Sequence, residues 1–156
     1  MRVGTRVGVD VGKVRIGVAR SDPHGLLATP VETVQRGDGD IARILGIVAE
    51  SGAIELIVGL PLSLAGTRTA STEDAVAFAQ RLAGAADVPV RLVDERLSTV
   101  SAHSQMRASG RSTRQSRSVI DQAAAVIIVQ HALDSERSAG TPPGEIAHPD
   151  EGHRHG

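Results

Sequence analysis

The sequence contains no cysteine, tryptophan or tyrosine, and Phe78 is its one phenylalanine. The absence of cysteine excludes disulfide bonds, thiolate metal sites and cysteine nucleophiles. Because aromatic residues are so few, the core has to be built from Val, Ile, Leu and Ala, which fits aliphatic layers between helices and a sheet. A chain of 156 residues is long enough to form one such domain.

The sequence also lacks a run of about 20 consecutive apolar residues, and Met1 leads directly into strand-like sequence instead of an export signal. We therefore expect a cytoplasmic protein without a membrane segment. The formal net charge of −1 argues against a uniformly basic surface for nucleic acid. The charge is uneven, however, because residues 107–118 carry four arginines and no acid.

Alternating and continuous apolar patterns predict five strands. The first three are separated by turn residues and form an antiparallel meander, whereas the last two are unbroken apolar runs, typical of parallel strands buried on both faces. The predicted strands cover residues 6–11, 14–18, 26–34, 54–60 and 90–93. The sequence therefore predicts an α/β domain with a mixed five-stranded sheet.

Helical spacing of apolar residues predicts helices that flank this sheet. Asp40 is placed to cap the first helix, and the last helix is apolar nearly all round between Ala123 and Val129, so it should be buried against the sheet. The predicted helices cover 40–51, 74–85, 99–109 and 119–137, with a mobile loop at 110–118. The Gly- and Pro-containing sequence predicts a flexible tail at 139–156, which leaves 1–138 as the domain.

Acidic residues lie where separate elements of this fold could meet. Asp10 is on the first strand, Asp94 and Glu95 close the last predicted strand, and Asp121 opens the last helix. Oxygen ligands select hard cations such as Mg²⁺ or Mn²⁺, which support phosphodiester hydrolysis. Each acid also has a structural explanation, namely a turn cap, a solvated strand end, or a Ser-x-x-Asp capping box. The spacing alone leaves these alternatives open.

Two glycines, Gly8 and Gly12, share the strand face of Asp10 and would let a ligand approach the backbone. Residues 8–13 superficially resemble a P-loop. They have three residues instead of four between the glycines, however, and Val14 replaces the required Ser or Thr. Walker-type nucleotide binding is therefore excluded.

Basic residues and one turn supply candidate contacts to phosphate, because Lys and Arg neutralise phosphate charge and an open turn offers backbone N–H groups. The candidates are Lys13, Arg15, Gly59 in the turn Gly59-Leu60-Pro61, Arg96, Arg107, Arg111, Arg114 and Arg117. The last four would share one face if their segment became helical on binding. Ion pairs with nearby acids, strand termination and a solvated loop are the alternative explanations.

Four sequence blocks, in order, resemble the YqgF family, a Holliday-junction-resolvase-like family associated with pre-16S rRNA processing. The blocks are VDVGKVRIGVA at 9–19, IVGLP at 57–61, DERLST at 94–99 and DQAAA at 121–125. The resemblance extends from about Arg6 to Leu133. It implies a ribonuclease H-like fold and metal-dependent phosphodiester hydrolysis, and it places the acidic positions of the family at Asp10, Glu95 and Asp121.

The resemblance implies a nuclease that trims the 5′ end of precursor 16S rRNA in ribosome biogenesis, with Mg²⁺ or Mn²⁺ as cofactor and structured RNA as partner. A monomer or weak homodimer is expected. One alternative is a resolvase acting on branched, four-way DNA, which requires a dimer so that two sites cut symmetrically. A non-catalytic nucleic-acid-binding or ribosome-assembly factor is another. A phosphotransferase related to sugar kinases would need two such domains to enclose ATP.

Overall fold

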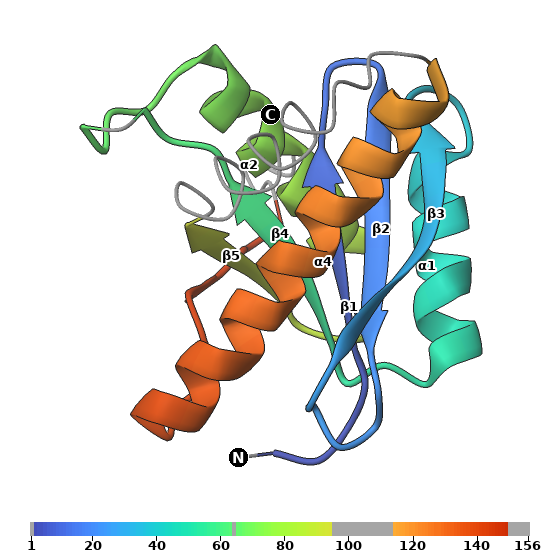
Figure 1. The fold of residues 1–156 in the computed structure, drawn as a ribbon. Coiled ribbons are helices and arrows are strands. Elements are labelled where there is room, and N and C mark those ends of the chain that lie inside the picture. The colour runs from blue at the N-terminus through green and yellow to red at the C-terminus, as the bar shows by residue number, and fades with distance from the viewer. Residues whose placement is uncertain (1, 64, 95–113, 150–156) are drawn as a thin grey trace.

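The computed structural model describes residues 2–63, 65–94 and 114–149. Within them, six strands form one sheet in the order β3-β2-β1-β4-β5-β6 (Figure 1). The strands are β1 (Arg6–Val11), β2 (Arg15–Ser21), β3 (Ala28–Gln35), β4 (Glu55–Leu60), β5 (Val90–Asp94) and β6 (Glu145–Ile146). The first three strands form the predicted antiparallel meander, and β4 and β5 run parallel to β1. The mixed sheet predicted from the sequence is confirmed, with one strand more.

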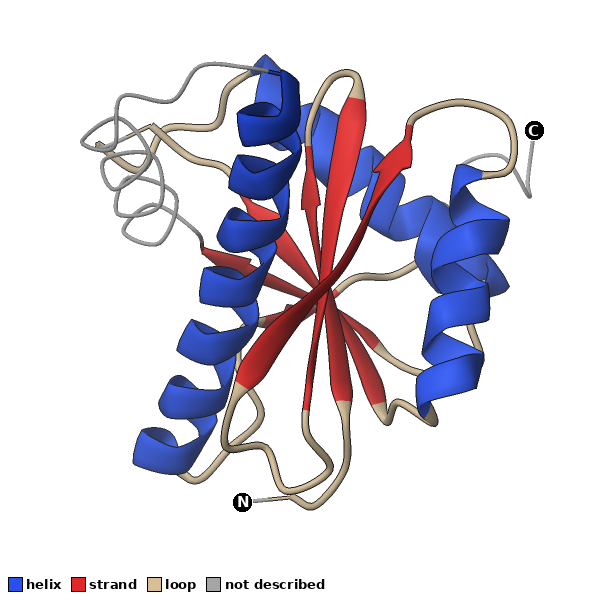
Figure 2. Cartoon of the chain, turned by 45° about the vertical axis from the view of Figure 1, so that its right-hand side comes forward, coloured by secondary structure: helices blue, strands red, loops and turns tan. Residues whose placement is uncertain are grey.

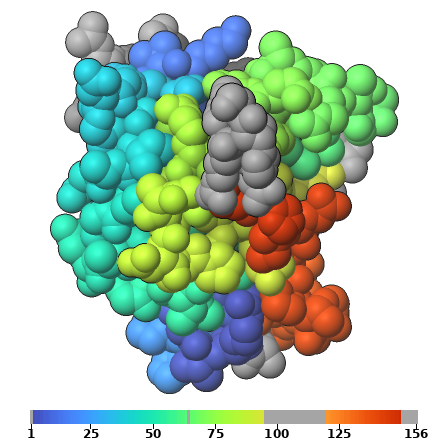
Figure 3. Space-filling view, turned by 180° about the vertical axis from the view of Figure 1, so that it is seen from behind, coloured from blue at the N-terminus to red at the C-terminus, as the bar shows by residue number. Residues whose placement is uncertain are grey.

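Helices cover both faces of the sheet, as Figure 2 shows. The helices α1 (Asp40–Ser51) and α2 (Ala70–Ala85) cover one face of the sheet, and α4 (Arg114–Ala139) crosses the other. Figure 3 views the molecule from the side of α1 and α2. Successive side chains of each strand point to opposite faces of the sheet. Val7 and Val9 lie in the aliphatic core with α1 and α2, whereas a Cβ atom on Gly8 would overlap the side chain of Val129 in α4.

Small residues allow α4 to lie directly on the sheet. Ala125 and Val129 of α4 pack against Ala19 of β2, and all three are fully buried. The predicted burial of this helix against the sheet is thereby confirmed. No helix in the described ranges has the length and apolar character needed to span a bilayer.

Both ends of α4 differ from the prediction. The helix begins at Arg114 instead of residue 119, so its first turns fall in the segment that we expected to be a loop. The predicted start is placed where apolar residues begin to recur, at Val119. Arg and Gln are good helix formers and extend the helix toward its N-terminus without apolar residues. The capping box, which was the alternative explanation for Asp121, is therefore excluded, because Asp121 lies inside the helix. The helix predicted at 99–109 lies outside the described residues.

The segment after α4 corrects the predicted start of the tail at residue 139. Gly140 has a positive φ of 76° directly after the helix, and the chain then turns back so that Glu145–Ile146 pair with β5. Ala147 is buried in the same core as α1 and α2. Composition could not reveal this return, because a two-residue strand and one alanine carry almost no local signal. Residues 150–156 of the predicted tail lie outside the described residues.

The start of α1 also differs from the prediction. Gly39 is the N-cap residue, with a φ of 89° and no side-chain cap. Asp40 instead accepts a hydrogen bond from the backbone N–H of Gly37 at 3.1 Å. Its other oxygen, Oδ1, accepts a hydrogen bond from the backbone N–H of Ile41 at 2.7 Å. Asp40 therefore binds an N–H of the first turn as predicted, but from within the helix, because Gly39 and not Asp40 is the N-cap residue.

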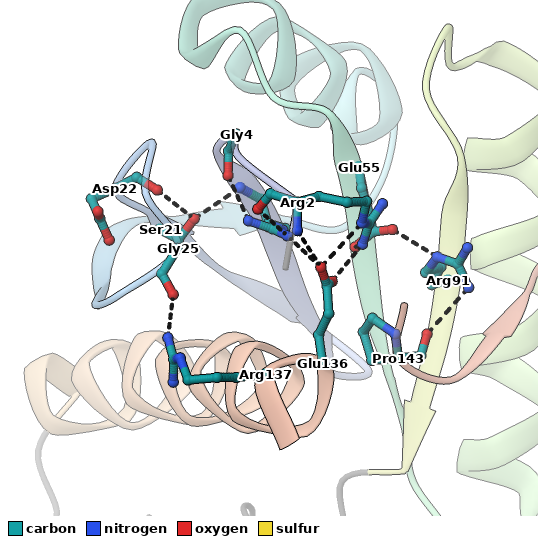
Figure 4. A network of polar contacts seen from close by, with 11 residues as sticks. Arg2, Gly4, Ser21, Asp22, Gly25, Glu55, Arg91, Glu136, Arg137 and Pro143 are labelled. Carbon is teal, nitrogen blue, oxygen red and sulfur yellow. Dashed lines mark hydrogen bonds and ion pairs between the residues drawn. The ribbon is translucent and has the colours of Figure 1, made fainter. Parts of the chain in front are cut away.

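A buried ion-pair network joins the C-terminal part of α4 to the beginnings of β1 and β4 (Figure 4). Glu136 accepts hydrogen bonds from Arg2 at 2.6 Å and from Arg6 at 3.0 Å. Glu55 pairs with Arg2 at 3.1 Å and with Arg91 at 2.7 Å. The hydrogen bond from Arg2 lowers the pKa of Glu136 to about 2, although burial opposes this shift. Glu136 therefore remains ionised within the folded protein at neutral pH.

Candidate active site

Asp10 lies on β1 and faces α4. It is directly opposite Gly17 in the antiparallel pairing of β1 with β2, and opposed residues of such a pair project to the same face of the sheet. A Cβ atom on Gly17 would overlap the backbone carbonyl of Asp121 in α4. Gly8, two residues before Asp10, also faces α4. Two independent contacts therefore assign the Asp10 side chain to this face.

The backbone of Asp121 in α4 lies against Gly17. The next residue, Gln122, donates a hydrogen bond from Nε2 to Oγ1 of Thr33 at 3.0 Å. Thr33 is opposite Gly17 in β3, so this turn of α4 lies over one row of strand residues. Gly17 therefore neighbours Asp10 within the sheet and the backbone of Asp121 in the helix.

Arg15 binds the carboxylate of Asp121. Its Nε donates to Oδ2 of Asp121 at 2.8 Å, and the two side chains are 28% and 20% exposed. The sequence allowed two explanations for Arg15, a phosphate contact and an ion pair with a nearby acid. The ion pair is present in this structure, and the phosphate contact remains a prediction.

Arg36 supports the hairpin that carries Asp10. Its Nη1 donates to the carbonyl of Gly12 at 3.0 Å, and its guanidinium makes two hydrogen bonds to Asp74 of α2 at 2.7 and 3.2 Å. The hydrogen bonds to Asp74 raise the pKa of Arg36. No pattern in the sequence singled out Arg36, because its partners are 24 and 38 residues away.

Strand β5 shows on which face of the sheet Asp94 lies. Val90 and Leu92 of β5 belong to the core with α1 and α2, whereas Val93 packs with Ile128 of α4. Strand alternation therefore assigns Asp94 to the face opposite Asp10. Glu95, the preferred candidate, lies outside the described residues.

The other predicted phosphate contacts have different positions. Lys13 is exposed at the hairpin end and lines a pocket of about 700 Å³ that also includes residues of α1 and α2. Gly59 lies inside β4, paired with Val93. The open turn predicted there is wrong, because the strand continues to Leu60. Arg114 and Arg117 lie in the first two turns of α4, and Arg96, Arg107 and Arg111 lie outside the described residues.

Glycines that we expected to admit a ligand have a structural role. Gly8 is approached by Val129 of α4, and Gly12 by the carbonyl of Arg15 in its own hairpin. The glycine that matters most for Asp10 and Asp121 is Gly17, which the sequence analysis did not single out. A glycine inside a strand pattern often marks a close backbone approach, so the sequence alone could have predicted that another segment lies against Gly17.

The described acids fit a hard divalent cation. Carboxylate oxygens are the ligands that Mg²⁺ and Mn²⁺ prefer, and the guanidinium of Arg15 already places a positive charge against Asp121. Within the described residues no group of three His, Cys, Asp or Glu side chains gathers in a way that could hold a metal. Among the predicted acids of the family blocks, Asp10 and Asp121 lie within the described residues and Glu95 lies outside them.

Comparison with known proteins supports the family resemblance that the four sequence blocks indicate. The sequence profile of the family described as "RuvX: Holliday junction resolvase" matches residues 4–135. A protein of Clavibacter michiganensis subsp. michiganensis is 64% identical over 149 residues, which is 94% of this chain and 92% of that protein. A protein of Leifsonia xyli subsp. xyli is 62% identical over 151 residues, which is 96% of this chain and 97% of that protein. Both are named "Putative pre-16S rRNA nuclease".

The structure of Thermus thermophilus RuvC in complex with Holliday junction substrate aligns with a TM-score of 0.59 at 16% identity, over 90% of this chain and 99% of that chain. This similarity shows the fold. Fold and relatives together define a nuclease with a ribonuclease H-like fold, a hydrolase of phosphodiester bonds. The chain belongs to the RuvX family of Holliday junction resolvases, which is the family that the four sequence blocks resemble.

Proposed function

We propose that this chain is a divalent-metal-dependent nuclease that uses Asp10, Glu95 and Asp121 to process the 5′ end of precursor 16S rRNA. The observation that carries the proposal is the position of Gly17, which is the pairing partner of Asp10 in the sheet and lies against the backbone of Asp121 in α4. A capping role no longer explains Asp121, because the residue lies inside the helix. Asp94 lies on the opposite face of the sheet, which supports Glu95 as the third acid.

In this proposal one group of residues binds the cation and another group binds the phosphate. Asp10, Glu95 and Asp121 would hold Mg²⁺ or Mn²⁺, and the chemistry that such a cation supplies when bound is activation of water and stabilisation of charge on the phosphate. Lys13 and the arginines would contact the neighbouring nucleic-acid backbone. Arg36 would keep the hairpin, and therefore Asp10, in place through Gly12.

The names of the two relatives, both above 60% identity over most of the chain, support precursor 16S rRNA as the substrate. The test is cleavage of a precursor 16S rRNA fragment with its 5′ extension, in Mg²⁺ or Mn²⁺. We expect Asp10→Asn and Asp121→Asn to lower the rate by about 100-fold or more, because each would remove a charged cation ligand. Asp134→Asn is the matched control on α4, since Asp134 is 59% exposed and far along the helix. Wild-type rates in Asp10→Asn would contradict the proposal.

The description of the family favours a second candidate substrate, the four-way DNA junction. Symmetric cleavage of a junction needs two active sites and therefore a dimer. The same preparations should be assayed on a four-way junction, with the mass of the protein–DNA complex determined by light scattering. Faster cleavage of the junction than of the RNA, by a dimer, would favour the resolvase.

A further inference from the structure

The ion pair between Arg15 and Asp121 occupies the carboxylate that the proposed cation would use. Arg15 Nε lies 2.8 Å from Oδ2 of Asp121. The pair is partly exposed, with 28% and 20% of the two side chains accessible. The two side chains come from different elements, β2 and α4, and Gly17, which lies two residues after Arg15 on β2, is the pairing partner of Asp10.

A guanidinium and a divalent cation cannot share this position without a cost. Both are positive, and like charges a few ångströms apart repel one another strongly where water is partly excluded. The hydrogen bond from Arg15 also uses a lone pair of Oδ2 that would otherwise be available as a metal ligand. Arg15 therefore weakens the binding of a cation at Asp121.

We propose that Arg15 is an internal counter-cation that competes with the divalent cation for Asp121. This inference rests on the proposed function. In the absence of metal, Arg15 neutralises Asp121 and holds it on the face of Asp10. When the cation binds, the guanidinium leaves Oδ2 and becomes available to a phosphate, whose oxygens its N–H donors match.

The exchange requires only a side-chain movement. The backbone of Arg15 is fixed by the hydrogen bond from the N–H of Gly12 to its carbonyl at 2.9 Å. The side chain beyond it is partly exposed, so it can change rotamer without disturbing the hairpin. Neither β2 nor α4 has to move, and Asp10 keeps its position opposite Gly17.

The test measures Mn²⁺ binding by the full-length protein without nucleic acid, by titration calorimetry and by the electron paramagnetic resonance signal of free Mn²⁺. We expect Arg15→Gln to bind Mn²⁺ about tenfold more tightly than the wild type, which corresponds to about 1.4 kcal/mol. Arg15→Lys keeps the competing charge and should bind with nearly wild-type affinity. Arg43→Gln is the matched control, because Arg43 also pairs through Nε with a carboxylate, that of Glu32, at 3.0 Å.

A second measurement follows the arginine itself. Titration with diamagnetic Mg²⁺ should shift the Nε–H resonance of Arg15 as its partner is lost, and leave that of Arg43 unchanged. Thermal unfolding confirms that each variant is folded. Equal or weaker Mn²⁺ binding by Arg15→Gln, with binding that still depends on Asp10, would overturn this inference and leave the proposed function intact. Absence of Mn²⁺ binding in both wild type and Arg15→Gln would overturn both.

Discussion

Replacing Glu136 by Gln should destabilise the protein, because it removes a negative charge from the buried network of Figure 4. Glu136 is 2% exposed and accepts hydrogen bonds from Arg2 at 2.6 Å and from Arg6 at 3.0 Å. Arg6 is itself only 1% exposed. In the variant, the guanidinium of Arg6 would stay buried without the anion that now neutralises it.

The magnitude follows from the pKa of the carboxyl. The hydrogen bond from Arg2 is the largest cause that lowers the pKa of Glu136 from 4.5 to about 2. Because one pKa unit corresponds to about 1.4 kcal/mol, the ionised form contributes about 3 kcal/mol to the free energy of unfolding at pH 7. Removal of one partner from a buried ion pair typically costs about 3–5 kcal/mol. Both arguments give an expected loss of about 3 kcal/mol for Glu136→Gln.

The assay is urea unfolding at pH 7 followed by far-UV circular dichroism, because the chain has no Trp or Tyr to report by fluorescence. Asp134→Asn is the control, since Asp134 is 59% exposed and pairs with Arg137 three residues later. Its effect should stay below about 1 kcal/mol. The double substitution Arg6→Met and Glu136→Leu should recover much of the loss, because it removes both charges of the buried Arg6–Glu136 pair. A loss below about 1 kcal/mol for Glu136→Gln would refute the reasoning.

Two further predictions concern acid stability and the packing of α4. The lowered pKa of Glu136 means that its stabilising contribution is complete above its unfolded value of 4.5 and is lost as the pH falls toward 2. The difference in unfolding free energy between wild type and Glu136→Gln should therefore shrink over this range in urea titrations, and a constant difference would contradict it. Gly17→Ala should destabilise the protein by about 1–3 kcal/mol and lower nuclease activity, because its Cβ would overlap the backbone of Asp121. Gly46→Ala in α1, where a Cβ meets nothing within 4 Å, should stabilise it by about 0.5–1 kcal/mol. Equal unfolding free energies for these two variants would contradict the contact assigned to Gly17.

Strands β1 to β5 were predictable because the alternation or continuity of apolar residues in each follows which of its faces are buried. Val7 and Val9 alternate with Gly8 because β1 has the aliphatic core on one face and α4 on the other. Residues 55–59 are all buried because β4 lies in the middle of the sheet. Such patterns depend on local sequence alone, so the meander and the parallel pair could be predicted without the structure.

Features that depend on distant partners were not predictable in the same way. Glu55 lies within an apolar run and Glu136 within a helix, and neither position indicates that both carboxylates pair with Arg2, which is 53 and 134 residues away. The return of 145–146 to β5 likewise needs the structure, since its pairing is with Arg91 and Leu92. The sequence could name Asp10 and Asp121 as acids of interest, but their shared position at Gly17 follows from how α4 crosses the sheet.

The two ends of α4 are held in different ways, and this difference bears on function. Near its C-terminus, Glu136 is buried between two arginines. About 22 Å away, at 1.5 Å per helical residue, Asp121 is held by one partly exposed pair with Arg15 and by close contact with Gly17. The buried network can fix the helix on the sheet while the carboxylate of Asp121 changes its partner. A Glu136→Gln variant should therefore lose stability and also weaken Mn²⁺ binding, whereas Arg15→Gln should strengthen binding at nearly unchanged stability.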